Sequence, residues 1–375
     1  MDVIITKKGD KSCYITVNSS GLLICEHEDG IKQELSENMT NEFDVYAEDD
    51  GSFDVFGVSA DGNLLHIRNA DGNTTVHTVL QNKSDKGKIT SVRVFKIYGR
   101  YHLFYCINHS ERLLVHHIAG YGDYTMEPEV VDRIDEEFLY DIVCDEDKNM
   151  YVIYSGENAL LKRKYTYGSK SFSDPYTISD IRVRSVSGVY FNDKLYVAYT
   201  TQDKGRYCVF LKDTDSGYQT EIGIKVHSDT KVALIIQNGN LCVEWVENSM
   251  CFATVCTADL VKERVKILGR TRGLARLKAV GGDSLVSAVA MNLSAKPYGN
   301  IDDMITMHPK PQFEYSGQQV DMLSRKYMEV LSRKNDFVDF GAELTRIESA
   351  LERLVMLAES VINEIKSGKE IEEEQ

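Results

Sequence analysis

Membrane-spanning apolar runs, proline and tryptophan are absent or scarce in this sequence. Its 375 residues include 5 Pro and 1 Trp, a composition that favours packed structure over disordered linker. No apolar stretch reaches the roughly 18 residues that a transmembrane helix requires, so we expect no membrane partner. The N-terminus lacks a basic segment followed by an apolar run, which favours a cytoplasmic location, while release by cell lysis would leave no trace in a sequence.

Positive charge is also scarce. Lys and Arg number 43 against 58 Asp and Glu, which gives a formal net charge of −15. Nucleic acids and anionic membranes bind surfaces whose positive charge displaces counterions. We therefore expect no nucleic-acid partner, and the acidity mainly supports solubility.

Motifs of known chemistry are missing. The sequence contains no G-x-S-x-G, P-loop, G-x-G-x-x-G or H-E-x-x-H segment. Its 8 cysteines stand singly, without a C-x-x-C pair or zinc-ligand spacing, and we interpret them as reduced core residues. His116 and His117 are adjacent on a predicted strand, so their rings point to opposite faces, and we expect one to be buried and one exposed. The sequence predicts no metal and no cofactor, and it favours a protein that is not an enzyme.

An alternating apolar pattern recurs seven times in the first 290 residues, at intervals of 40 to 49 residues. That interval matches the four short antiparallel strands of one β-propeller blade. Alternation with period two excludes a helical repeat of similar length, because helices would space apolar residues by three and four. The pattern predicts an all-β propeller. The copies are CYITV from Cys13, FDVFG from Phe53, YHLFY from Tyr101, MYVIY from Met150, LYVAY from Leu195, LCVEW from Leu241 and LVSAV from Leu285.

The second unit shows the internal plan of a blade. Four alternating runs are separated by Asp50-Gly51, Asp61-Gly62 and Asp71-Gly72, which are hairpin turn signals. Over residues 1–292 the repeat resembles β-propeller repeat proteins in general, without the WD dipeptide of WD40 units or the paired glycines of kelch units. The resemblance implies the fold and no catalytic residue.

The last unit leaves the number of blades open between seven, which we favour, and six. Its third strand is the weak IDDMITM segment from Ile301, and a fourth is missing. We expect the N-terminal DVIIT segment from Asp2 to supply an outer strand there, which would close the ring and remove an exposed edge.

The hydrophobic period changes from 2 to 3.5 after Pro311. The sequence therefore predicts a propeller over residues 1–312 and a helical coiled-coil segment with an acidic tail over residues 313–375. An apolar seam runs through this segment on alternating steps of three and four residues. It consists of Phe337, Phe340, Leu344, Ile347, Leu351, Leu354, Ala358, Val361 and Ile365.

Residues 262–278 are the most distinctive charged feature of this acidic chain, with seven basic residues against one acidic residue. Arginine forks bind carboxylates and phosphates, so this segment is a candidate anion site, the alternative being a solvated outer-strand face. A similar connection between blades carries two further arginines. The candidate site residues are Arg182, Arg184, Arg270, Arg272 and Arg276.

Three functions are compatible with these patterns. The favoured hypothesis is a non-catalytic binding module whose propeller face binds a protein or glycan ligand, in copies joined by the coiled coil as in phage-tail-like receptor-binding proteins. The second is a hydrolase or lyase acting on an anionic glycan at the channel mouth, where Asp44 and Asp141 occupy equivalent places in aligned inner strands. The third is an intracellular scaffold whose helix pairs with another protein.

The residues of the seam predict the number of associated chains. Leu at a and Ile at d, as at Leu344 and Ile347, favour three or four strands over two. The alternatives are pairing with another helical protein and packing of the helix on the propeller.

We expect the full chain to sediment as a trimer or tetramer at micromolar concentration. Leu351→Asp should convert it to a monomer, because a carboxylate at an a position is buried without a partner. Glu352→Gln lies one residue off the seam and should leave the sedimentation coefficient unchanged. A monomeric wild-type chain would disprove self-association.

Overall fold

The computed structural model describes most of the chain as far as residue 298. These residues form strands and turns and no helix, so the all-β prediction holds for them. Within the same residues, no helix is long and apolar enough to cross a membrane. The predicted coiled coil, the boundary at residue 312 and the IDDMITM segment lie outside the described residues. Those residues are 2–298 except 8–9, 49, 71, 83–86, 98, 120–127, 135–139, 146 and 280–287.

Six groups of successive strands, numbered here 1 to 6, occupy the described residues. Group 1 is β1 (Val3–Lys7), β2 (Asp10–Val17), β3 (Leu23–His27) and β4 (Lys32–Ser36). Group 2 is β5 (Met39–Ala47), β6 (Phe53–Ser59), β7 (Leu64–Ala70) and β8 (Asn73–Leu80). Group 3 is β9 (Lys88–Ile97), β10 (Arg100–Asn108), β11 (Arg112–Ala119) and β12 (Glu129–Arg133).

The remaining groups follow the same order. Group 4 is β13 (Tyr140–Cys144), β14 (Met150–Ser155), β15 (Leu160–Thr166), β16 (Ser171–Phe172) and β17 (Tyr176–Ser179). Group 5 is β18 (Val183–Phe191), β19 (Lys194–Asp203), β20 (Arg206–Asp213) and β21 (Gln219–Val226). Group 6 is β22 (Lys231–Gln237), β23 (Asn240–Glu247), β24 (Met250–Cys256) and the first part of β25 (Lys266–Ala279), which also pairs with β26 (Val289–Asn292).

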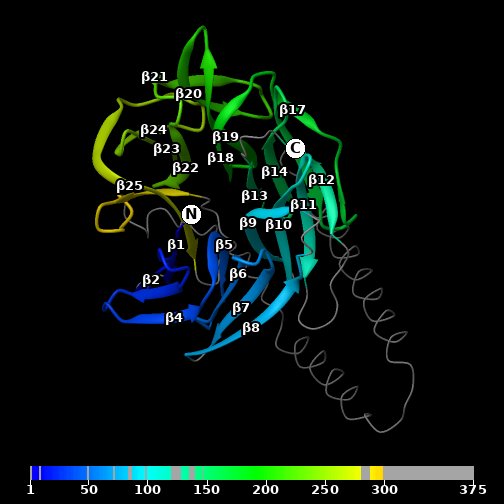
Figure 1. Cartoon of the computed structure of the whole chain (residues 1–375). Coiled ribbons are helices and arrows are strands. Elements are labelled where there is room, and N and C mark those ends of the chain that lie inside the picture. The colour runs from blue at the N-terminus through cyan, green and yellow to red at the C-terminus, as the bar shows by residue number, and fades with distance from the viewer. Residues whose placement is uncertain are drawn as a thin grey trace, which may run out of the picture. The chain divides into compact units, whose positions relative to one another are not determined.

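Each group is an antiparallel sheet whose successive strands are hydrogen-bonded neighbours, with β16 and β17 both pairing with β15. Figure 1 shows the groups following one another around a common centre, with β5, β9, β13, β18 and β22 on the inner side. This arrangement is a β-propeller, as the repeat predicted. The number of blades in the whole chain also depends on residues 280–287 and 299–308, which are not described.

The first six copies of the repeated motif correspond to the second strands of the six groups, and most of the seventh copy, from Leu285, lies outside the described residues. The side chains of these second strands are buried on both faces, as in β6, because each sheet is covered by the next one around the ring. Between groups 3 and 4, for example, Phe104 and Cys106 of β10 share a core cluster with Ile142 of β13 and Val152 of β14. All eight cysteines are buried and none forms a disulfide.

The predicted aspartate-glycine turns connect the strands of group 2. Gly51 and Gly62 have φ of 88° and 86°, a region that glycine adopts without steric cost. The Asp50 carboxylate accepts a hydrogen bond of 2.8 Å from the Ser52 N–H, which fixes the first turn. Asp and Gly are therefore required there for different physical reasons.

The two ends of the propeller meet at a parallel strand pair. Strand β1 pairs antiparallel with β2 and parallel with β25, where Val3 lies opposite Arg276. The expectation that the N-terminal segment forms an outer strand of the last unit was wrong, since β1 lies between β25 and β2. Its antiparallel pairing with β2 leaves the other edge of β1 for β25, so the ends are still joined by backbone hydrogen bonds.

A buried charge cluster reinforces this closure. Asp44 of β5 lies 3.0 Å from Arg276 Nη1 and 3.0 Å from Lys278 Nζ. Its Oδ2 also accepts the Val94 N–H of β9 at 2.9 Å. Arg276 Nη1 donates to the carbonyls of Phe43 and Val92, each at 3.0 Å. The last described group is thereby tied to groups 2 and 3 through side chains that are at most 7% exposed.

Asp44→Asn should lower the free energy of unfolding by about 3–5 kcal/mol, because it leaves two buried cations without a counter-charge. Urea denaturation at neutral pH measures the change. The matched variant Asp180→Asn alters an exposed carboxylate and should change stability by less than about 0.5 kcal/mol. Equal effects of the two substitutions would show that the cluster does not stabilise the ring.

Candidate functional site

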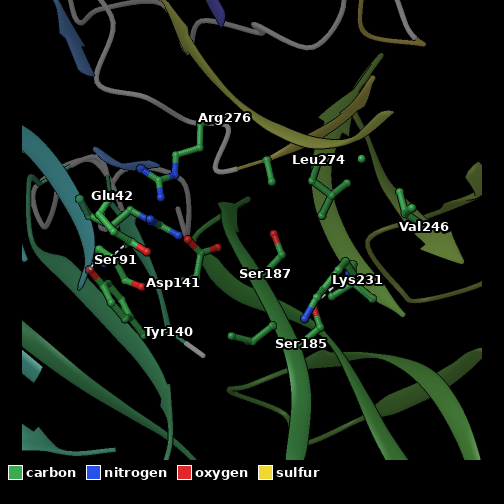
Figure 2. Close-up of a pocket in the computed structure, with 15 residues that line it drawn as sticks. Glu42, Ser91, Tyr140, Asp141, Ser185, Ser187, Lys231, Val246, Leu274 and Arg276 are labelled. Carbon is green, nitrogen blue, oxygen red and sulfur yellow. Dashed lines mark hydrogen bonds between the residues drawn. The ribbon is translucent and has the colours of Figure 1, made fainter. Parts of the chain in front are cut away.

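A cavity of about 400 Å³ lies where the first strands of groups 2 to 6 converge with β25. Its lining mixes charged, hydroxyl and small apolar side chains, as Figure 2 shows. The lining residues are Glu42, Ser91, Arg93, Tyr140, Asp141, Ser185, Val186, Ser187, Lys231, Val232, Val246, Gly273, Leu274, Arg276 and Ala288. The cavity is therefore built by residues far apart in sequence that only the closed ring brings together.

Side-chain oxygens join neighbouring first strands around the cavity. Asp141 Oδ2 of β13 accepts the Gly188 N–H of β18 at 2.9 Å. Ser185 and Ser187 of β18 accept the N–H groups of Val232 and Leu234 of β22, both at 3.0 Å. First strands of adjacent groups share no backbone ladder, so these buried N–H groups need side-chain acceptors. The wall of the cavity is held by such contacts.

The same contact recurs on the other side of the ring. Glu42 Oε2 accepts the Ser91 N–H, and Asp44 accepts the Val94 N–H as described above. Asp44 and Asp141 thus perform the same task in groups 2 and 4. They differ in position, because Asp141 lines the cavity whereas Asp44 is fully buried and is not among the lining residues.

Three basic side chains face the cavity. The Arg93 guanidinium carbon lies 5.4 Å from the centre of the Tyr140 ring, within the range of a cation–π contact, and Nη1 donates to the Val92 carbonyl. Lys231 is exposed and has no ion-pair partner among the described residues. Arg276 is buried, and its Nε forms no hydrogen bond within the described part of the chain. Two of these cations are therefore fixed by the wall and one is exposed.

Of the five arginines predicted as an anion site, Arg276 lines the cavity and the other four do not. Arg270 and Arg272 are exposed on β25, while Arg182 is exposed and Arg184 half-buried at the start of β18. The register of β25 shifts between Thr271 and Gly273, which is a β-bulge. That shift separates the environment of Arg272 from that of Arg276.

Sequence reasoning missed Arg93, Tyr140, Ser185, Ser187 and Lys231. No local motif marks them, since they are scattered over the first strands of four different groups. The available signal was the blade interval: the acceptor and donor residues of the contacts from Asp141, Ser185 and Ser187 are each 47 positions apart.

A buried histidine pair lies in group 3, away from the cavity lining. The expectation that one of His116 and His117 is exposed was wrong, because both are at most 3% exposed. Tyr165 of group 4 covers His116, and Tyr105 lies against His117. His116 Nε2 is 3.0 Å from His102 Nδ1. Burial lowers the pKa of His116 to about 3 and that of His102 to about 4, so both rings are neutral at pH 7.

The described residues contain no group of three or more His, Cys, Asp or Glu side chains arranged to hold a metal ion. One isolated carboxyl, Glu244 of β23, lies two residues before the lining residue Val246 and is 2% exposed. Its Oε2 accepts the Ala290 N–H of β26 at 2.8 Å. Burial raises the pKa of Glu244 to about 7. This carboxyl connects β23 to β26 beside the cavity.

No family model matches this chain, and no curated protein matches it by sequence. Among solved structures, a puromycin hydrolase S511A mutant complexed with PGG is similar, with a TM-score of 0.53 and 11% identity. The likeness covers 79% of this chain and 53% of the hydrolase, so this chain spans about half the length of that protein. At such identity the likeness concerns the fold alone.

Two lectin structures show weaker likeness. The BP39L lectin from Burkholderia pseudomallei has a TM-score of 0.46 and 10% identity, over 70% of this chain and 93% of the lectin. The fungal lectin of Aleuria aurantia, described as a six-bladed β-propeller that recognises fucose, has a TM-score of 0.44 and 12% identity, over 72% and 96% of the two chains.

The raised pKa of Glu244 predicts a pH dependence of stability. Between pH 4.5 and about 7 the unfolded chain has lost this proton and the folded chain retains it, so stability falls as pH rises through that window. Glu244→Gln keeps the hydrogen bond to Ala290 N–H. Across this window the free energy of unfolding of the variant should therefore fall by roughly 3 kcal/mol less than that of the wild type.

Urea denaturation from pH 4.5 to 8 measures the difference between variant and wild type. Glu157→Gln, at an exposed carboxylate, is the control and should leave the profile unchanged. Parallel profiles for Glu244→Gln and wild type would contradict the raised pKa.

Proposed function

We propose that this chain is a non-catalytic binding module that holds a small polar ligand of the glycan type in its central cavity. The observation that carries the proposal is the cavity itself, which the first strands of five groups and β25 surround. Its volume of about 400 Å³ falls within the range of small-molecule sites. A pocket of this kind needs polar groups at fixed places, and the contacts between groups fix them here.

The lining suits a hydroxylated ligand. Ser185 Oγ accepts the Val232 N–H and keeps its own proton as a donor toward a ligand. The apolar side chains of Val186, Val246 and Leu274 lie along the same cavity and offer contact for the C–H faces of a sugar ring. A sugar ring presents both hydroxyl groups and apolar C–H faces, so it fits a lining that offers both kinds of contact.

The carboxylates of the site support binding over catalysis. Asp44 lies between two cations and behind the wall, where a proton on its carboxylate would leave both cations unpaired. Glu42 and Asp141 each hold a backbone N–H of the next group. Glycoside hydrolysis requires two carboxyl groups free to exchange protons or attack the sugar. Release of product from an anionic glycan would instead favour the hydrolase or lyase hypothesis.

The C-terminal segment completes the proposal. Its heptad seam joins several copies, so that weak binding at single cavities becomes strong binding to a surface that displays many ligands. A protein ligand at the propeller face and a scaffold with a foreign helical partner are the alternatives. Recovery of a second protein in fixed ratio with this chain would favour the scaffold.

Leu274→Trp should abolish binding of sugars by filling the cavity with an indole ring. We expect the wild-type chain to bind at least one member of a panel of neutral and acidic mono- and disaccharides in ligand-detected NMR, and Leu274→Trp to weaken that binding at least tenfold. Leu293→Trp is the matched control, since Leu293 is 61% exposed outside the cavity lining.

Equal binding by Leu274→Trp and the wild-type chain would place the site elsewhere on the propeller. A wild-type chain that binds no sugar of the panel would contradict the proposal.

A further inference from the structure

We infer that the central cavity contains a carboxylate subsite formed by Arg276, so that the ligand of the proposed function is an acidic sugar or another small carboxylate. The inference rests on the proposed function, because it names the chemical class bound at the same cavity. Three observations carry it: the charge of the buried cluster, the hydrogen bonds of the guanidinium, and the charges of the surrounding wall.

The buried cluster carries one positive charge in excess. Asp44 is the counter-ion of both Arg276 and Lys278, and the three side chains are 0%, 6% and 7% exposed. Uncompensated charge is costly where side chains are so little exposed to water. An anion beside Arg276 neutralises the excess.

One edge of the Arg276 guanidinium is left for that anion. The Phe43 carbonyl, the Val92 carbonyl and Asp44 all lie on Nη1. Nε is buried and has no hydrogen-bond partner among the described residues. The hydrogen bonds that the guanidinium makes to the described residues both come from Nη1. Nε and Nη2 together form the planar fork that matches the two oxygens of a carboxylate. Arg276 lines the cavity, and Figure 2 shows its side chain directed toward the side on which Glu42 lies.

The charged residues in the rest of the wall leave the excess of one positive charge unchanged. The lining adds Arg93 and Lys231 as cations and Glu42 and Asp141 as anions. Among the described residues of the wall and the buried cluster, four side chains are positive and three are negative, an excess of one positive charge. In the described part of the chain no ion pair joins Glu42 to Arg276, and Glu42 instead accepts the Ser91 N–H.

An excess of one positive charge favours a singly charged ligand. A carboxylate supplies one negative charge and two coplanar oxygens, whereas a phosphate monoester near pH 7 approaches two negative charges. The arrangement is unusual in a chain whose formal net charge is −15, because the overall field repels anions. Selectivity for a carboxylate therefore comes from the local fork.

The experiment compares acidic sugars with their neutral amides. Isothermal titration of the full chain at pH 7.5 uses glucuronate, galacturonate and N-acetylneuraminate, each beside its primary amide. We expect at least one acid to bind tenfold or more tightly than its amide. The preference should fall severalfold when salt is raised from 0.05 M to 0.5 M.

Arg276→Lys tests the fork separately from the charge. Lysine retains the positive charge that Asp44 requires and loses the paired N–H groups of the guanidinium. We expect the acid-over-amide preference to fall at least tenfold. Arg206→Lys, at an exposed arginine of β20, is the matched control and should keep the wild-type preference.

A second variant keeps the proposal testable if Arg276→Lys does not fold. Lys231 is exposed, and within the described part of the chain no ion pair joins it to Asp44. We therefore expect Lys231→Gln to fold as the wild type does and to lower the preference severalfold through the lost charge. Circular dichroism melts confirm the fold of each variant before titration.

The outcomes separate the two claims. Equal binding of acid and amide to the wild-type chain, or an unchanged preference in Arg276→Lys, overturns the carboxylate subsite while binding of neutral sugars still upholds the proposed function. Tighter binding of inorganic phosphate or sulfate than of any carboxylate overturns the ligand class. Failure of every sugar, acidic or neutral, overturns the proposed function and the subsite with it.

Discussion

The buried cluster of Asp44, Arg276 and Lys278 is the interaction on which the rest of this structure depends. A propeller is stable only when its first and last sheets meet, because an open ring would expose sheet edges and apolar faces to water. Here β1 and β25 join by parallel backbone pairing, and the cluster ties β25 to β5 and β9 across the centre. The closed ring then positions the first strands that surround the cavity.

The same constraint shapes the cavity wall. Strands that diverge from a common centre share no backbone ladder, so their buried N–H groups depend on acceptors from the neighbouring group. Asp141, Ser185 and Ser187 supply these acceptors between groups 4, 5 and 6. The need for these acceptors therefore places carboxylates and hydroxyls at the centre of the ring. The same kinds of group can bind a polar ligand there. Arg276 combines both roles, since Nη1 donates to the carbonyls that join β25 to β5 and β9, while Nε has no hydrogen-bond partner among the described residues.

The fold was readable from the sequence because its signals are local. Alternation in segments such as that from Phe53 and turns such as Asp61-Gly62 depend on neighbouring residues alone. The pairing of β1 was not readable, because a parallel partner more than 270 positions away leaves no local pattern. The burial of both His116 and His117 was missed for a similar reason: Tyr165 belongs to the next group and covers one face.

The candidate site was only partly readable. Charge density in residues 262–278 pointed to Arg276, yet Arg276 lines the cavity while Arg272, beside the register shift between Thr271 and Gly273, is exposed. Arg93, Tyr140 and Lys231 are single residues of different groups, and they come together only when the ring closes.

A crystal structure of the full chain soaked with the tightest-binding acidic sugar tests the central claim most directly. The account predicts both carboxylate oxygens within hydrogen-bond distance of the Arg276 guanidinium; a ligand bound outside the central cavity would contradict it.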